Sequence, residues 1–396
     1  MVAENRGPLD GVRVTELAGI GPGPFTGMLL ADLGADVVQV ERPGGGSLPV
    51  QQSVQVVNRG KRSVVVDLKD PRGLDVVLRL AERSDVFLEG YRPGVAERLG
   101  AGPADLLARN PKLVYGRMTG WGQDGPLAPA AGHDIGYLAV TGALHAIGEA
   151  DGPPQIPLNY LGDYGGGSMF LALGVVSALV CARATGRGQV VDAAIVDGAS
   201  VLQAATWGYL ASGMWTDRRG SNLLDGGTPF YSVYATCDGR HMAVGALEPK
   251  FYATLIELLF APEGAPADLP GQHDMARWGE LRQALAARFA TRTQAEWAKV
   301  FDGSDACVAP VLPMKEAPAH PHLAARGTYV EVDGVTQPAP APRFAPGTGP
   351  GGAAPPAALP THRIPVPGEH TREILTELGV PGAEDLLSSG IARQSG

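Results

Sequence analysis

Apolar residues in the first third of the chain follow two alternating patterns. Short runs rich in valine and leucine predict β-strands, and longer stretches with an apolar residue at every third or fourth position predict helices. The predicted strands cover 12–17, 36–40, 64–68, 85–89 and 113–118, and the predicted helices cover 25–33 and 74–83. Strands that alternate with helices favour an α/β fold whose parallel sheet is covered on both faces.

Ligands of such folds bind at the carboxyl ends of the strands, so the loops after Glu41, Glu89 and Met118 are expected to form a site. Arg42 follows the second strand, and Tyr91 and Arg92 lie in a Gly-Tyr-Arg-Pro-Gly turn after the fourth. A guanidinium beside an aromatic ring suits phosphate pairing or stacking on a base. Solvated surface arginines remain the alternative for both loops.

The middle of the chain predicts a long apolar helix over 169–182 and a strand over 189–194. The apolar run is too short to span a bilayer, so we expect a buried core helix. A region of different texture follows from about 225 to 305. Further strands are predicted at 230–236 and 240–246, helices at 135–147, 251–260, 281–301 and 372–378, and a Pro/Ala/Gly-rich surface loop at 337–360.

The net charge of −9 argues against nonspecific nucleic-acid binding, although Arg42, Arg59, Lys61 and Arg62 lie close together in the sequence. The three cysteines are widely spaced and form no CxxC pair. This spacing predicts neither disulfides nor a zinc site and fits a reducing cytoplasm. The first residues show no apolar signal core, and we expect a cytoplasmic protein without a membrane span.

The segment Gly19-Ile20-Gly21-Pro22-Gly23-Pro24 resembles a dinucleotide fingerprint, with an acidic residue about twenty positions later. The fingerprint fails because proline stands at the third glycine position and Pro22 removes an amide donor. A tight turn that starts a helix is the better interpretation. His320 and His322 lack companion ligands at metal spacing, so no metal site is expected.

Two segments bring together groups suited to proton transfer at carbon. His133 and Asp134 stand at the predicted start of a helix, and Asp163 heads a glycine-rich turn into the long apolar helix. An imidazole, carboxylates and oriented backbone amides can remove a proton, hold the resulting anion and return a proton. Structural roles, such as helix capping by either aspartate, remain the alternative.

Taken together, several motifs resemble the CoA-transferase family III superfamily. They are GVRVTEL at 11–17, DLGADVV at 32–38, DLK at 67–69, GYRPG at 90–94 and GEHT at 368–371. Within the superfamily, three further motifs resemble the α-methylacyl-CoA racemase branch: GHDI at 132–135, GDYGGGSM at 162–169 and DACVAPVL at 305–312.

The resemblance implies an α/β fold with a Rossmann-like parallel sheet in a large domain, a smaller α+β domain, and an interlocked homodimer with shared active sites. The implied boundaries are 1–190 and 330–396 for the large CoA-binding domain, 191–224 for a linker, 225–305 for the small domain and 306–329 for a return linker. The chain is then expected to act on acyl-CoA, without nucleic acid or membrane as partner.

The resemblance also assigns the site. His133 and Asp163 would be the catalytic acid/base pair, and Glu248 from the partner subunit would orient His133. Asp134 would bind the pantetheine arm of CoA. The residues expected to contact CoA are Arg42, Val66, Asp67, Leu68, Lys69, Tyr91, Arg92, Arg98, Gly132, Asp134, Ile135, Gly136 and Tyr137. No separate cofactor is expected, because CoA is part of the substrate. Trp207, Met214, Trp215 and Phe230 are apolar residues near the expected acyl region, with core packing as the alternative.

The activity expected is racemisation of 2-methylacyl-CoA thioesters through an enolate, with an acid and a base on opposite faces of the α-carbon. The alternative is transfer of CoA between carboxylic acids through an acyl anhydride on Asp134. In the transferases the residue before that aspartate is generally not histidine, so His133 favours the racemase. A protein that binds CoA thioesters without turnover is a third hypothesis.

Overall fold

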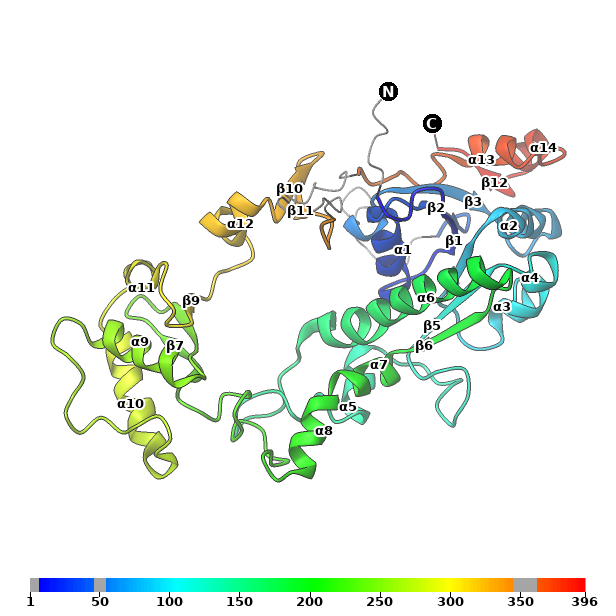
Figure 1. Ribbon diagram of the computed structural model, residues 1–396. Helices are drawn as coiled ribbons and strands as arrows, with labels where there is room; N and C mark the ends of the chain where they lie inside the picture. Colours follow the sequence, from blue (N-terminus) through cyan, green and yellow to red (C-terminus); the bar gives the residue numbers. More distant parts are fainter. Residues whose placement is uncertain (1–6, 46–54, 345–361, 396) are drawn as a thin grey trace. The chain divides into compact units, whose positions relative to one another are not determined.

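The computed structural model describes residues 7–45, 55–344 and 362–395 (Figure 1). Contacts between residues divide the chain into two compact units. The first unit contains Met1–Thr141, Leu158–Leu202 and Pro321–Gly396, and the second contains Gly142–Pro157 and Gln203–His320. Both ends of the chain therefore belong to the first unit. Most of the predicted loop 337–360 lies outside the described residues.

A seven-stranded sheet forms the centre of the first unit. Its order is β12-β3-β2-β1-β4-β5-β6, in which β1 to β6 run parallel and β12 pairs antiparallel with β3. The order 3-2-1-4-5-6 is that of doubly wound nucleotide-binding sheets. The strands are β1 (Arg13–Leu17), β2 (Asp36–Glu41), β3 (Lys61–Val66), β4 (Val86–Glu89), β5 (Val114–Thr119), β6 (Val190–Ala194) and β12 (Ala392–Arg393). The predicted parallel α/β fold is confirmed.

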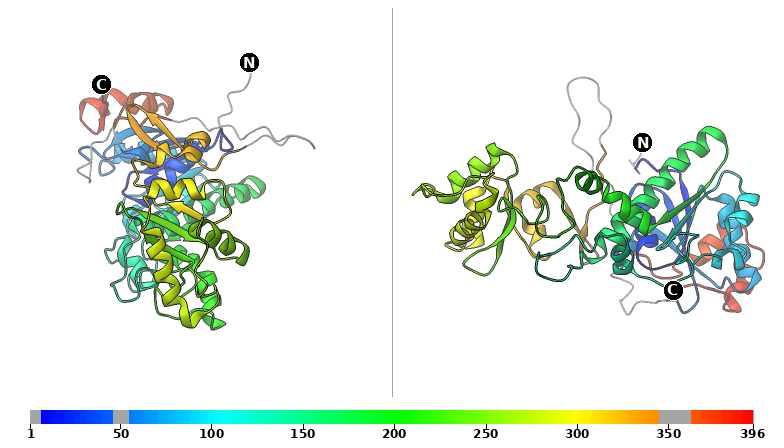
Figure 2. Two further views of the ribbon diagram at one scale, coloured as in Figure 1. Left: turned by 90° about the vertical axis from the view of Figure 1, so that its left-hand side faces the viewer. Right: turned by 90° about the horizontal axis from the view of Figure 1, so that it is seen from below.

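Helices cover both faces of this sheet, as the two further views show (Figure 2). On one face, α1 (Pro22–Asp32) and α6 (Met169–Thr185) pack against Val14, Val37 and Val114. Helices on the other face enclose Val38, Val64 and Phe87. They are α2 (Pro71–Arg83), α4 (Pro103–Arg109), α13 (Thr371–Glu377) and α14 (Ala383–Ser388). The short helix α3 (Val95–Arg98) follows β4.

The apolar helix α6 continues a glycine-rich helical segment. A 3₁₀ turn (η3, Leu158–Tyr160) and a π-helix (η4, Leu161–Ser168) precede it. The stretch Leu158–Thr185 is long and apolar enough to cross a membrane by length and composition. However, Leu171, Val175 and Ala178 are buried in the core formed with the sheet. The prediction of a core helix over 169–182 is therefore confirmed for this face of α6.

Two helix predictions differ from the structure. The helix predicted over 135–147 is α5 (Asp134–Val140), which ends early because Gly142 adopts a left-handed conformation with φ of 84°. The helix predicted over 281–301 is two helices, α10 (Trp278–Phe289) and α11 (Gln294–Phe301). Thr293, whose backbone is extended, caps the start of α11. Its hydroxyl accepts the amide of Glu296, and the Glu296 carboxylate accepts the amide of Thr293.

The second unit has its own core. Its antiparallel sheet contains β7 (Tyr231–Ala235), β8 (His241–Gly245) and β9 (Val308–Pro310), in that order. Helix α9 (Pro249–Phe260) packs with α10 and α11 around Phe289 and Trp297, which are fully buried. The remaining elements of the described chain are α7 (Ile195–Leu202), α8 (Ala204–Ala211), α12 (Pro321–Arg326), the hairpin of β10 (Tyr329–Val332) and β11 (Val335–Pro338), and the 3₁₀ turns η2 (Val56–Asn58), η5 (Met275–Arg277) and η6 (Ala317–Ala319).

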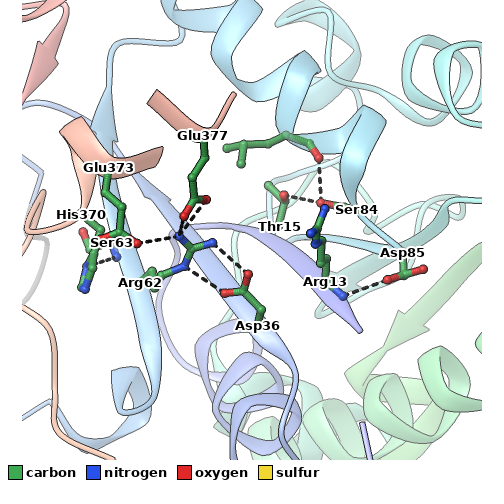
Figure 3. A network of polar contacts seen from close by, with 11 residues as sticks. Arg13, Thr15, Asp36, Arg62, Ser63, Ser84, Asp85, His370, Glu373 and Glu377 are labelled. Carbon is green, nitrogen blue, oxygen red and sulfur yellow. Dashed lines mark hydrogen bonds and ion pairs between the residues drawn. The ribbon is translucent and has the colours of Figure 1, made fainter. Parts of the chain in front are cut away.

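The C-terminal segment is fastened to the edge of the sheet by Arg62 and Ser63 (Figure 3). The Arg62 guanidinium contacts Asp36 at 2.8 Å, Glu377 at 2.9 Å and Glu373 at 3.1 Å. The amide of Ser63 donates to Nδ1 of His370 at 3.2 Å. In the motif at 368–371, Gly368 N donates to Ser63 Oγ, and Thr371 accepts the amide of Val65. This motif therefore acts in fold assembly.

Three members of the basic cluster at 42–62 have acidic partners within the fold. Besides Arg62, Arg59 forms a two-pronged pair with Asp32, and Lys61 Nζ lies 2.9 Å from a Glu16 carboxylate oxygen. The side chains of Arg59 and Asp32 are only 3% and 1% exposed. The charges of Arg59, Lys61 and Arg62 are therefore balanced by carboxylates within the fold, and these three residues do not form a basic pocket.

Substitution of Arg59 tests this assignment. We expect Arg59→Gln to lower the free energy of unfolding by about 3 kcal/mol or more, because it leaves the buried Asp32 carboxylate without its cation. The control Arg79→Gln breaks an exposed pair with Asp75 on α2 and should change stability far less. Urea unfolding followed by circular dichroism measures both. Equal losses in the two variants would contradict the assignment.

Candidate active site

A pocket of about 600 Å³ opens in the first unit beside the carboxyl ends of β1, β2, β4 and β5. It lies where the parallel sheet predicted a site, in the loops after Glu41, Glu89 and Met118. Eight of the predicted site residues line it: Arg42, Leu68, Tyr91, Arg92, Gly132, His133, Tyr137 and Asp163. The two predicted proton-transfer groups thus share one cavity.

His133 enters the pocket from the start of α5. Its backbone is extended, with φ of −136°, and it stands as the residue before the helix, while its carbonyl accepts the amide of Gly136 at 2.8 Å. The side chain is exposed to solvent, so it is accessible to a bound substrate. Tyr137, one turn later, is buried against Trp121.

Asp163 lies in the π-helix η4. A π-helical turn is wider than an α-helical turn and is frequent at functional sites. The amide of Asp163 donates to Asp134 Oδ1 at 2.7 Å. Its carbonyl accepts from the buried Ser168 hydroxyl at 3.0 Å, and the same hydroxyl lies 2.8 Å from the Pro22 carbonyl. Both polar groups of the Asp163 backbone are therefore held.

The environment of Asp163 favours its protonated form. Burial raises the pKa of the Asp163 carboxyl, and the nearby Asp134 carboxylate raises it further. The Asn159 amide group, 3.4 Å from Asp163 Oδ2, and the charge of His133 act in the opposite direction. The net effect places the pKa of Asp163 above its ordinary value, a shift that is typical of carboxyl groups that act as general acids.

The glycine-rich turn before α1 reaches the same carboxyl group. Gly21 has φ of 73°, and a Cβ built on it would lie 3.2 Å from Asp163 Oδ2. Helix α1 then begins at Pro22, as the interpretation of 19–24 as a turn before a helix predicted. The turn therefore forms a wall of the pocket, a role that the sequence analysis did not assign to it.

Glu89 supports the turn that carries Tyr91 and Arg92. Its side chain is 1% exposed, and it accepts Arg117 Nε at 3.0 Å and the amide of Tyr91 at 2.7 Å. This carboxylate and its buried arginine fix the turn at the end of β4, where both Tyr91 and Arg92 face the pocket. Sequence reasoning missed this role because Glu89 resembles an ordinary strand end.

A buried polar cluster forms another part of the wall. Glu16, Gln39 and Asn58 line the pocket, and Lys61 Nζ donates to Glu16 and to the Pro24 carbonyl behind them. Gln39 Nε2 bridges Glu16 Oε1 at 2.8 Å and Asn58 Oδ1 at 3.0 Å. Burial lowers the pKa of Lys61, against the opposing effect of the Glu16 carboxylate. No signal in the sequence separated these residues from strand and loop positions.

The other predicted site residues do not line the pocket. Val66 is buried in the sheet core opposite Ala392, and Asp67 accepts the amide of Lys69 in the following turn. Arg98 lies beside the 90–94 turn, where a Cβ on Gly94 would be 3.0 Å from its Nη1. Ile135 and Gly136 lie in the first turn of α5, Asp134 bonds to η4, and Glu248 stands before α9 in the second unit.

Of the four apolar residues suggested for the acyl region, Phe230 is a core residue. It is buried and packs edge-on against Tyr252 and Trp278. Trp207 and Met214, by contrast, are largely exposed. Across the described ranges, no group of three or more His, Cys, Asp or Glu side chains is arranged to hold a metal ion.

Comparisons with known proteins agree with this architecture. Residues 9–371 match CoA-transferase family III. The chain is 46% identical to alpha-methylacyl-CoA racemase of Homo sapiens, over 94% of this chain and 93% of the relative. It is 32% identical to the succinyl-CoA:glutarate CoA-transferase of Mus musculus, over 98% and 91% of the two chains.

Among solved structures, a CAIB/BAIF family protein from Brucella suis superposes with a TM-score of 0.79 at 30% identity. The match covers 94% of this chain and 99% of that protein. A family match over nearly the whole length, a relative at 46% identity and a shared fold lead to one conclusion: the chain belongs to CoA-transferase family III.

Proposed function

We propose that this protein is an α-methylacyl-CoA racemase, an isomerase that inverts the α-carbon of 2-methylacyl-CoA thioesters. The observation that carries the proposal is the presence of His133 and Asp163 in one pocket, with Asp163 in an environment that favours its protonated form. The 46% identity to a racemase over 94% of the chain supports the same activity.

The mechanism is proton transfer through an enolate. A thioester carbonyl acidifies the neighbouring carbon because the carbanion delocalises onto oxygen. In one direction, neutral His133 removes the α-proton and protonated Asp163 delivers a proton to the opposite face; the reverse direction exchanges the two roles. This chemistry requires no cofactor beyond the CoA already attached to the substrate.

The glycine-rich sequence predicts that amides at the start of η4 stabilise the enolate oxygen. In the structure, not all of these amides are free to do so. The Asp163 amide donates to Asp134 Oδ1 at 2.7 Å, so this donor is already occupied. Stabilisation of the enolate therefore requires other donors around the pocket.

The nucleotide end of CoA would bind along the loops after β2 and β4. Arg42 and Arg92 would pair with its phosphates, and Tyr91 offers an aromatic face for the base. Leu68, at the turn after β3, adds an apolar contact, and the predicted contacts of Lys69 and Arg98 belong to the rim of this region.

The cytoplasmic location expected from the cysteines stays a prediction.

A homodimer is part of the proposal. Leu173 and Val180 on α6 are 65% and 66% exposed, and Trp207 on α8 is 61% exposed. No residue of α8 is buried. Large exposed apolar side chains on α6 of the first unit, and separately on α8 of the second unit, indicate surfaces that a partner covers. A second copy would cover them and bring a second-unit Glu248 to His133, where the carboxylate would fix the imidazole tautomer.

CoA transfer remains the alternative function, with Asp134 as nucleophile. Two features disfavour it. Asp134 Oδ1 already accepts a main-chain amide at 2.7 Å, which reduces its nucleophilicity, and His133 precedes it. The lower identity of 32% to a CoA-transferase agrees with this order of preference.

Hydrogen exchange distinguishes the two activities. Incubation of a 2-methylacyl-CoA in deuterated water should replace its α-hydrogen by deuterium, as measured by mass spectrometry, while chiral analysis follows racemisation. His133→Ala and Asp163→Ala should each reduce racemisation by at least about a hundredfold, because each removes one proton-transfer group. Movement of CoA to an added free acid without exchange would favour transfer, and binding without either reaction would favour the third hypothesis.

The fit of the turn at Gly21 against Asp163 can be tested by adding one methyl group. Gly21→Ala should lower kcat by about tenfold or more, because the new Cβ meets Asp163 Oδ2 and the left-handed backbone disfavours alanine. The matched variant Gly19→Ala adds a Cβ that meets no atom within 4 Å. Similar kcat values for G21A and G19A would argue against contact between this turn and the proton donor.

The exposed face of α6 provides the test of dimerisation. Val180→Glu should shift the protein towards monomer in sedimentation velocity, because a charge is costly to bury in an apolar interface. Val366→Glu is the control, since Val366 is also exposed but stands in the C-terminal part of the chain. A wild-type protein that sediments as a monomer would remove the dimer from the proposal.

A further inference from the structure

Asp134 contacts the backbone of the proton donor. Its Oδ1 accepts the Asp163 amide at 2.7 Å. A Cβ built on Gly162 would lie only 2.2 Å from Asp134 Oδ1, so the carboxylate rests directly on the main chain of η4. One side chain therefore ties the start of α5 to the start of the π-helix.

The connection joins the two groups that must face one α-carbon. His133 and Asp134 are consecutive, so the residue that carries the imidazole and the residue that holds the Asp163 backbone move together. The other end of η4 is fixed separately, because Ser168 Oγ bonds to the Asp163 and Pro22 carbonyls. The main chain of Asp163 is thus held from both sides, and the Asp134 contact relates it to His133.

Asp134 also acts on Asp163 through its charge. Its carboxylate opposes ionisation of Asp163, an effect second only to burial, and thus raises the pKa of Asp163. The other titratable groups that face Asp163 come from α5 as well: His133, whose charge lowers that pKa, and Tyr137. Among the described residues, the contacts of η4 with other elements include Asn159 of η3, Pro22, Phe25 and Thr26 of α1, Met118 of β5, and Ile195, Gly198, Ala199 and Leu202 of α7, none of which titrates near neutral pH.

We propose that Asp134 is a positioning residue that acts through Asp163: it anchors the Asp163 main chain opposite His133 and places a negative charge beside the Asp163 carboxyl. This inference rests on the proposed racemase function and deepens it. It gives Asp134 a role in proton transfer in addition to the expected contact with the pantetheine arm.

The charge is tested by Asp134→Asn, which keeps an oxygen that can accept the Asp163 amide and replaces the charged carboxylate by a neutral amide of the same size. Racemisation requires that one of the two groups, His133 or Asp163, carries a proton and the other does not. At acid pH both groups are protonated and the rate falls. A lower pKa of Asp163 therefore moves this acid limb to lower pH. We therefore expect the acid limb of kcat/KM against pH to move down in D134N. Asp134→Ser, whose hydroxyl can accept the same amide, replaces D134N if that variant does not fold.

The matched control is Asp75→Asn on α2, which removes the same charge from an exposed ion pair. Its acid limb should coincide with that of the wild type. A D134N limb at the wild-type position would overturn the electrostatic part of the proposal. Wild-type enzyme that fails to exchange the α-hydrogen would instead refute the racemase function itself, so the two failures are distinguishable.

The anchoring is tested by Gly162→Ala, which leaves the charge of Asp134 in the chain and displaces its carboxylate from the η4 backbone. We expect kcat to fall by about tenfold or more, since small misplacements of a proton donor are costly to turnover. KM is measured separately, because displacement of Asp134 also alters its expected contact with the pantetheine arm, whereas the CoA-binding loops after β2 and β4 are untouched. A G162A enzyme with wild-type kcat would overturn the anchoring.

Discussion

The close packing of the π-helix η4 on its neighbours is the constraint on which the pocket depends. A Cβ on Gly198 would lie 1.8 Å from the Gly166 carbonyl, and a Cβ on Gly166 would lie 2.8 Å from the Ala199 amide. Main chain therefore meets main chain where η4 and α7 cross at these glycines. On another side, Phe25 of α1 stacks on Tyr164 at 4.3 Å. With η4 fixed in this way, the position of Asp163 is set by the backbone and depends little on a flexible side chain.

Ion pairing inside the fold decides which cations remain for a ligand. Arg59, Lys61 and Arg62 carry the charge that makes the 42–62 region look basic, yet each lies against at least one carboxylate of the same unit. Separate removal of either partner would leave a buried or half-buried charge, which is costly. The pocket receives its positive charge from Arg42 and Arg92, which stand on loops at strand ends. The fold therefore uses the charges of Arg59, Lys61 and Arg62, whereas Arg42 and Arg92 belong to the proposed CoA site.

The sequence predicted the sheet well because burial on both faces leaves a direct mark, a run of apolar residues at each strand. It also located His133 and Asp163, through motifs that resemble a known family. It could not predict the π-helix, because glycines at 165–167 carry no periodicity, and it extended α5 beyond Val140 because the left-handed Gly142 ends the helix. The partners of Asp134, Glu89 and Glu16 depend on contacts between distant segments, which no local pattern encodes.

The dipeptide His133-Asp134 explains how one fold can support two reactions. A carboxylate that attacks a thioester must present a free oxygen to the carbonyl carbon. Asp134 directs one oxygen to the Asp163 amide, and it stands beside an imidazole able to remove a proton. In the proposed racemase the same carboxylate holds the Asp163 backbone, and its charge raises the pKa of Asp163 and so favours the protonated form. In the proposed mechanism the contacts of this aspartate, and not the sheet, distinguish inversion at carbon from transfer of CoA.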